Sequence, residues 1–163
     1  MSDQPSILMT ARDYFILKSL RDRCCEAGDP VHRLLSAKLV SAGVLRGDEV
    51  PGDLVTLESR VAYRVGDGPE ETRAIVQDER RNLVGLTLPL TNTRALAMLG
   101  LRVGESVAAT TSEGDPEMVT VTRLLYQPEA AQRRPQEAQS APRPSVLRLI
   151  HSGEPSHRQG GKA

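Results

Sequence analysis

The chain has 163 residues, enough for one domain with a modest core and an appendage. Basic and acidic residues balance at 21 each, which excludes a broad positive field that would attract nucleic acid. Aromatic residues are scarce, with no tryptophan, one phenylalanine and three tyrosines, so a base-stacking surface and sequence-specific nucleic-acid binding are not expected.

The cysteines and the first residues indicate a compartment. Cys24 and Cys25 are adjacent, so they do not form an ordinary structural disulfide, and this fits a reducing compartment. The chain starts without the basic residues and long apolar run of a signal peptide, and no apolar run approaches ~18 residues. We therefore predict a cytoplasmic protein without a membrane span.

The first part of the chain predicts two helices. Thr10 is a helix cap, and apolar residues follow it at intervals of three and four. Asp29 and Pro30 are a typical helix start, with the acid as cap and the proline in the first turn. Residues 26–29 form the turn between the helices. An antiparallel helical hairpin, a short coiled coil, is predicted for residues 1–49.

The pattern then changes to a period of two, which is typical of strands with one buried face. A helix of about two turns, capped by Asn92, interrupts these strands. The short connections favour antiparallel pairing. The sequence therefore predicts an α+β fold in which the hairpin precedes a five-stranded, mostly antiparallel domain over residues 50–131. The predicted strands cover residues 53–65, 71–77, 82–88, 105–111 and 118–126.

The composition changes from Gln127 onward, where five of the eleven prolines and five glutamines lie. Mixed charge and low apolar content predict a disordered tail over residues 132–163. Its one apolar run, residues 145–150, is open to two interpretations, a docking peptide or a segment without a partner.

Gly100 and Gly104 raise the question of a phosphate-binding loop. Their spacing matches neither GxGxxG nor GxxxxGK[ST]. Gly100 follows the short helix, where a left-handed residue is needed, and Gly104 turns the chain into the next strand. Both glycines are therefore predicted to be structural.

Catalytic patterns are also missing from the sequence. His32 lies on a helix, and no Ser/His/Asp or Cys/His arrangement with a nucleophile elbow is present. Glu26 and Asp29 are the only carboxylate pair at a projecting tip. They could hold Mg²⁺, but a helix-capping role for Asp29 is favoured. No enzyme activity, cofactor or metal is predicted.

Three blocks carry a resemblance to a known family. The segment LTNTRALAMLGLRVGESV resembles the C-terminal domain motif of the Gre transcription factors. The segments GDLVTLESRVAYRV and LLYQPEAA are more narrowly similar to a Gre-like group of nucleotide-kinase regulators with a shortened hairpin. The resemblance covers about residues 7–131. It implies an N-terminal coiled coil and an FKBP-like domain that docks on RNA polymerase near its secondary channel.

The resemblance also implies where the contact with polymerase lies. It is expected on the short helix and its exit loop, at Thr91, Asn92, Thr93, Arg94 and Arg102. Where the family has Ser-Pro, this sequence has Asn92-Thr93. The asparagine still caps the helix, but the rigid proline of the first turn is replaced.

Hairpin length predicts the activity. In the Gre factors that this chain resembles, two carboxylates at the hairpin tip reach the catalytic Mg²⁺ through the channel, and the backtracked transcript is cleaved. The first helix here, Thr10 to Cys25, spans only ~22–24 Å at ~1.5 Å per residue. Glu26 and Asp29 are therefore expected to stop short of the active site.

The predicted function is a non-catalytic regulator, a monomer that binds RNA polymerase and competes with Gre factors. One alternative is a peptidyl-prolyl isomerase, because the implied fold is shared with such enzymes. That activity needs an aromatic-lined pocket, which this composition hardly supplies. A second alternative is direct contact with nucleoside diphosphate kinase, which only the resemblance suggests.

Overall fold

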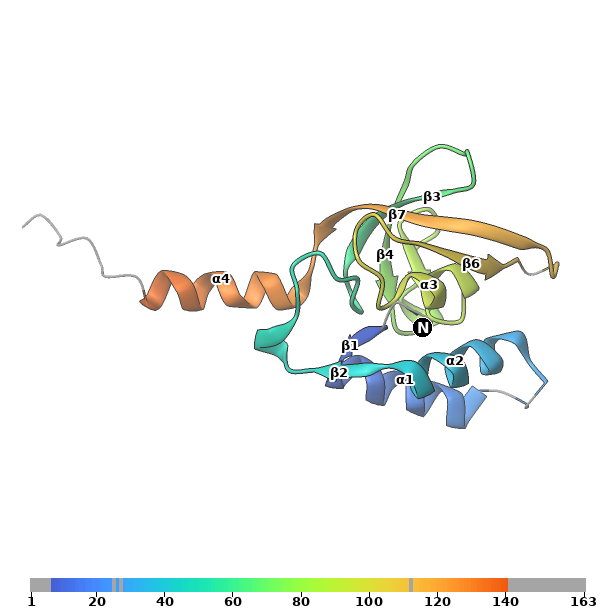
Figure 1. The fold of residues 1–163 in the computed structure, drawn as a ribbon, viewed down its shortest axis with the longest axis horizontal. Helices are drawn as coiled ribbons and strands as arrows, with labels where there is room; N and C mark the ends of the chain where they lie inside the picture. Colours follow the sequence, from blue (N-terminus) through green and yellow to red (C-terminus); the bar gives the residue numbers. More distant parts are fainter. Residues whose placement is uncertain (1–6, 25, 27, 112, 141–163) are drawn as a thin grey trace, which may run out of the picture.

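The computed structural model describes residues 7–24, 26, 28–111 and 113–140. It shows an α+β fold, as predicted, in which the helical hairpin lies below a curled sheet (Figure 1). Helix α3 (Thr93–Met98) packs against strands of the sheet on one side and against the hairpin on the other. Helix α4 (Pro128–Ser140) projects away from this body.

Two antiparallel helices make the hairpin, α1 (Ala11–Cys24) and α2 (Pro30–Ser41). Both predicted caps are confirmed. The Thr10 hydroxyl oxygen accepts a hydrogen bond of 3.0 Å from the backbone N–H of Asp13. The Asp29 carboxylate accepts one of 2.8 Å from the backbone N–H of Val31, which satisfies a donor that the helix leaves free.

The main sheet has five strands in the order β5-β4-β3-β7-β6. All neighbouring pairs are antiparallel except β4 and β5, which run parallel, so the predicted mostly antiparallel sheet is confirmed. The strands are β3 (Arg60–Val65), β4 (Glu71–Val76), β5 (Thr87–Pro89), β6 (Ser106–Thr110) and β7 (Pro116–Tyr126).

The first and third predicted strands are shorter than expected. Residues 53–59 are not part of β3, because the chain turns there: the backbone N–H of Ser59 bonds the Thr56 carbonyl, and Glu58 has a φ of 68°. Thr56, a polar residue of the first predicted strand, is buried. The third predicted strand begins only at Thr87, because Gly85 has a φ of 81° and the chain turns before it.

Other elements were not predicted. Two short strands at the ends of the hairpin, β1 (Leu8–Thr10) and β2 (Gly43–Leu45), pair in parallel. Two single-turn helices, η1 (Gly47–Glu49) and η2 (Glu79–Arg81), lie in connections. Helix α4 extends beyond residue 131, so the predicted tail starts inside a helix, and its later part, with residues 145–150, lies outside the described residues.

Hairpin and sheet share one hydrophobic core. Leu17, Leu35 and Leu39 of the hairpin belong to the same buried cluster as Tyr63, Leu96 and other residues of the sheet and α3. The hairpin therefore lies against the body of the protein along its length (Figure 1). The predicted domain limits at residues 49 and 131 stay predictions.

A buried lysine joins α2 to α3. Lys38 is 4% exposed, and its Nζ donates hydrogen bonds to the carbonyls of Ala97 and Leu99 at the end of α3. These carbonyls have no partner within their own helix, so the lysine serves as a C-terminal cap from another element. Burial lowers the pKa of Lys38 from 10.5 to about 7.

Candidate functional site

A cleft lies between the hairpin turn and the start of α3. Its volume is about 440 Å³. Two helix N-termini face it, each capped by a side chain: Asp29 caps α2, and Asn92 caps α3. The structure thus brings Asp29 of the predicted hairpin tip together with most of the predicted docking residues, whereas Glu26 is not among the lining residues. The cleft is lined by Asp29, Pro30, Val31, Thr91, Asn92, Thr93, Arg94, Thr111 and Glu117.

The departure from Ser-Pro is compensated locally. The Asn92 side chain accepts a 2.9 Å hydrogen bond from the backbone N–H of Arg94, so it still caps α3. The Thr93 hydroxyl donates a 2.6 Å bond to the carbonyl of Thr110 at the end of β6. A hydrogen bond to the sheet therefore holds the first turn in place where the family has a rigid proline.

Arg94 does not present a free charge. Its guanidinium forms a two-pronged ion pair with Glu117 of β7, with Nε 2.6 Å from Oε1 and Nη2 2.9 Å from Oε2. These hydrogen bonds hold the pKa of Glu117 below its ordinary value. About a third of the Arg94 side chain is exposed. The pair fixes the arginine at the rim of the cleft.

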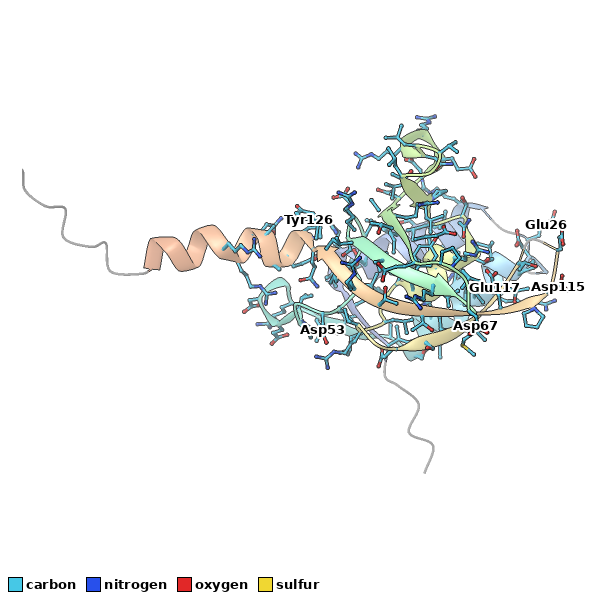
Figure 2. All side chains as sticks on the ribbon, turned by 90° about the horizontal axis from the view of Figure 1, so that it is seen from above. Glu26, Asp53, Asp67, Asp115, Glu117 and Tyr126 are labelled. Atoms are coloured by element: carbon cyan, nitrogen blue, oxygen red, sulfur yellow. The ribbon has the colours of Figure 1, made fainter. Side chains whose placement is uncertain are left out.

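Arg102 lies elsewhere. Its guanidinium bonds both carboxylate oxygens of Asp53 at 3.0–3.1 Å. Figure 2 places Asp53 toward α4 and Glu117 near the opposite end of the molecule. The structure therefore separates Arg102 from the cleft, and the two predicted arginines do not form one positive surface.

Thr91 connects the cleft to its surroundings. It is exposed, and its hydroxyl donates a 3.1 Å hydrogen bond to Glu79 of η2. It also lines a second cavity of about 570 Å³, between α1 and η2. Thr91 thus lines both the cleft and this second cavity.

The two carboxylates at the hairpin tip, Glu26 and Asp29, differ in exposure and in hydrogen bonding. Glu26 is exposed and lies at the end of the molecule opposite α4 (Figure 2). Asp29 is partly buried and committed to capping α2, and its backbone N–H bonds the Glu26 carbonyl at 3.0 Å. The capping interpretation of Asp29 is confirmed, whereas a functional role of the tip stays a prediction.

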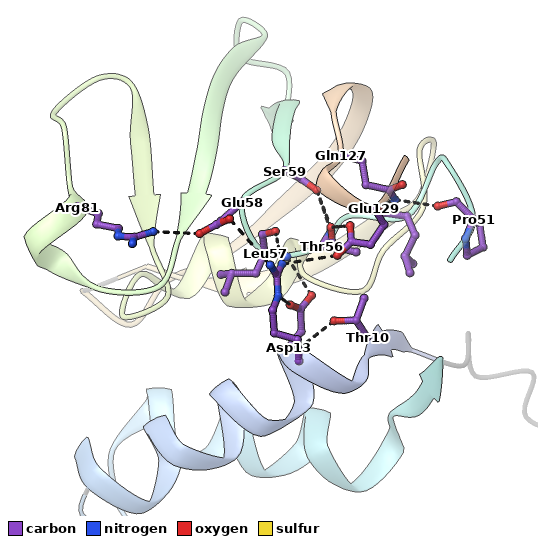
Figure 3. A network of polar contacts seen from close by, with 12 residues as sticks. Thr10, Asp13, Pro51, Thr56, Leu57, Glu58, Ser59, Arg81, Gln127 and Glu129 are labelled. Atoms are coloured by element: carbon purple, nitrogen blue, oxygen red, sulfur yellow. Dashed lines mark hydrogen bonds and ion pairs between the residues drawn. The ribbon is translucent and has the colours of Figure 1, made fainter. Parts of the chain in front are cut away.

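A polar network, not foreseen from the sequence, fixes the direction of the hairpin (Figure 3). The buried Asp13 carboxylate accepts a 3.0 Å bond from the Leu57 N–H, and Arg12 donates to the Leu57 carbonyl. Arg12 also lies 3.6 Å from Glu129 of α4, whose other oxygen accepts a 2.7 Å bond from Thr56. Burial raises the pKa of Asp13. Three distant segments are thereby joined at the start of α1.

Lys38 was missed as well. The spacing contained a signal, because Lys38 follows Leu35 by three residues on the apolar face of α2. A lysine on such a face is usually solvated, so this spacing by itself does not predict burial. Within the described residues, no helix is long and apolar enough to cross a membrane. No group of three possible metal ligands is found there either.

Comparison with known proteins identifies relatives. No protein-family model matches this chain. Curated proteins named regulator of nucleoside diphosphate kinase, from Escherichia coli (strain K12) and Shigella flexneri, are each 33% identical over 129 residues, which is 78% of this chain and 95% of each relative.

A solved structure shares the fold. It is described as the prokaryotic transcription elongation factor GreA/GreB from Nitrosomonas europaea, and it matches with a TM-score of 0.60 at 24% identity. The match covers 76% of this chain and 100% of that one. The resemblance found in the sequence is thus confirmed, and the chain belongs to the family of the regulator of nucleoside diphosphate kinase.

Proposed function

We propose that this protein is a non-catalytic transcription regulator that binds RNA polymerase near the secondary channel. The observation that carries the proposal is the cleft where the hairpin turn meets the start of α3. The Gre resemblance links both segments to polymerase. Family membership and the shared fold support the same class of function.

The geometry of the hairpin supports binding without transcript cleavage. Helix α1 has 14 residues and is therefore about 21 Å long. The hairpin packs against the sheet and α3 instead of extending freely from them. Of the two tip carboxylates, Asp29 already caps α2. Such a hairpin would occupy the mouth of a channel, where it competes with longer Gre factors.

Arg94 provides the test of the binding site. Changing Arg94→Ala is expected to weaken binding to core RNA polymerase about tenfold, because it removes a partly exposed charge at the cleft rim. Affinity is measured by titrating labelled protein with polymerase. Glu117→Gln is the matched control, since it weakens the same ion pair from the other side and keeps an acceptor.

An equal loss of affinity in both variants would mean that binding depends on the intact ion pair and not on a direct contact of Arg94 with polymerase. No binding of the unmodified chain to polymerase would overturn the proposed function. Crosslinking with mass-spectrometric mapping gives an independent check, with crosslinks expected from residues 91–94 to the channel rim.

Transcript cleavage should not be stimulated. Stalled elongation complexes incubated with the protein are expected to keep their transcripts intact, because the tip carboxylates cannot reach the catalytic metal. The variants are Glu26→Gln and Asp29→Asn, and the second retains a capping side chain. Robust cleavage that both variants abolish would contradict the non-catalytic assignment.

Direct contact with nucleoside diphosphate kinase is the second candidate, because the curated relatives are named as its regulators. The two candidates differ in their partner. Titration of labelled protein with purified kinase and with polymerase separates them. In the proposed function the effect on the kinase is indirect, through transcription. The isomerase alternative gains no support from the cleft, because the described residues that line it include no aromatic side chain.

A further inference from the structure

The connection between β4 and β5, residues 77–86, exposes an unusual amount of apolar surface. We name it the apolar loop. Leu83, Val84 and Leu86 are 59%, 94% and 60% exposed. Single apolar residues on a surface are normal, but three within four residues form a contiguous patch. In Figure 2 this light-green segment projects from the body of the protein.

The apolar loop is held in shape by its own hydrogen bonds. The Thr87 hydroxyl oxygen accepts a 2.6 Å bond from the Leu83 N–H, and the Leu83 carbonyl accepts backbone bonds from Leu86 and Thr87. Asp78 caps η2 by accepting a bond from the Arg80 N–H. The apolar side chains are therefore presented outward by an ordered backbone.

Two contacts attach the apolar loop to the rest of the molecule. Glu79 accepts a hydrogen bond from Thr91, immediately before α3. Arg81 lies 3.0 Å from Glu58, in the turn that precedes β3. Because Thr91 and Arg94 belong to the same short segment, the apolar loop and the cleft are held in a fixed relation.

A shallow cavity makes the two surfaces continuous. It has a volume of about 390 Å³ and extends from the apolar loop to the start of α3. Its lining includes Val84 and Gly85 of the apolar loop and Thr91 and Asn92 before α3. The same two residues, Thr91 and Asn92, line the cleft of the candidate site.

The apolar loop also carries two acidic and two basic side chains. Arg80 is exposed and has no ion-pair partner within residues 7–24, 26, 28–111 and 113–140. The neighbouring acids are engaged, since Asp78 caps η2 and Glu79 binds Thr91. A partner that covers Leu83 and Val84 would therefore be complementary if it placed a carboxylate next to its own apolar side chains.

We propose that the apolar loop is the second half of the polymerase-docking surface. It receives a segment of RNA polymerase that presents apolar side chains beside a carboxylate. Val84 is the apolar anchor, flanked by Leu83 and Leu86, and Arg80 pairs with the carboxylate. This inference rests on the proposed function and assigns it a surface that the resemblance to Gre factors does not include.

The test compares two exposed valines. Val84→Glu is expected to weaken binding of the full chain to core RNA polymerase at least tenfold, because it places a charge in an apolar contact and near the carboxylate of the partner. Val40→Glu is the matched control, since Val40 is 88% exposed at the C-terminal end of α2 and lines neither the cleft nor the cavity beside the apolar loop. Both variants should keep the melting temperature of the unmodified protein.

Arg80→Gln tests the charge separately. It should weaken binding about fivefold at low salt, and the difference should vanish at high salt. Unchanged affinity of Val84→Glu, with Arg94→Ala still impaired, would overturn this inference and leave the proposed function standing. Unchanged affinity of Arg80→Gln at low salt would overturn the carboxylate assignment. If the unmodified chain does not bind polymerase, both fall together.

Discussion

Replacing Gly100 with alanine is expected to lower the free energy of unfolding by about 3 kcal/mol. Gly100 follows α3 with a φ of 90°, a conformation that side chains with a Cβ rarely adopt. A Cβ there would also lie 2.6 Å from Cγ2 of Ile7 and 3.0 Å from the carbonyl oxygen of Leu8. The chain entering β1 would have to move, and with it the pairing of β1 with β2.

Gly104 offers a control with the same backbone conformation. Its φ is 93°, but no atom of the residues that the structure describes lies within 4 Å of an added Cβ. Gly104→Ala should therefore cost only the conformational strain, about 1 kcal/mol. Both variants are measured by urea unfolding, followed by circular dichroism. Equal losses of stability in the two variants would show that the steric clash of the new Cβ with Ile7 and Leu8 adds nothing to the conformational strain.

The stability of the unmodified protein should rise by roughly 3 kcal/mol between about pH 7 and pH 9.5 through Lys38. Burial lowers the pKa of Lys38 to about 7 in the folded chain, from the value of 10.5 that the unfolded chain keeps. Over this interval the unfolded state holds a proton that the folded state has lost. Raising the pH therefore favours folding, and below about pH 7 the full cost of burying the ammonium remains.

The hydrogen bonds of Lys38 survive this titration. A neutral amine still has two N–H groups, which match the two carbonyl acceptors, Ala97 and Leu99. Deprotonation thus removes the cost of desolvating the Lys38 ammonium and keeps the hydrogen bonds between α2 and the end of α3. The contact between the hairpin and α3 should therefore be more stable at mildly basic pH than at neutral pH.

Unfolding free energies measured at several pH values check this expectation. Lys38→Met removes the titrating group but keeps most of the apolar stem, so its stability should lose the rise seen in the unmodified protein. Lys18→Met changes an exposed lysine of α1 and should keep the rise. An identical rise in the Lys38→Met variant would show that other groups cause it.

The parts of the fold that were predicted correctly depend on neighbours in the chain. Thr10, Asp29 and Asn92 cap helices because each side chain reaches a backbone N–H two or three residues away. Val61 and Tyr63, two residues apart, likewise mark a buried face of β3, although Ala62 between them is buried as well. Such interactions leave a readable spacing.

The misplaced third strand shows the limit of that spacing. Residues 82–86 contain strand-forming residues, yet Gly85 and the Thr87 hydroxyl stabilise a turn that exposes Leu83 and Val84. Apolar content alone does not determine whether another element covers a segment. The sequence alone therefore does not predict that the apolar loop is exposed as a candidate docking surface.

The sequence by itself determined the class of fold, the helix caps, the structural role of Gly100 and Gly104, and the family. Tertiary structure alone decided that Lys38 caps α3, that Arg94 pairs with Glu117, and that Arg102 is kept apart from the cleft. These pairings join residues far apart in the chain, and their energies depend on burial and on which groups meet. No local period records them, so they become visible only when the chain is folded.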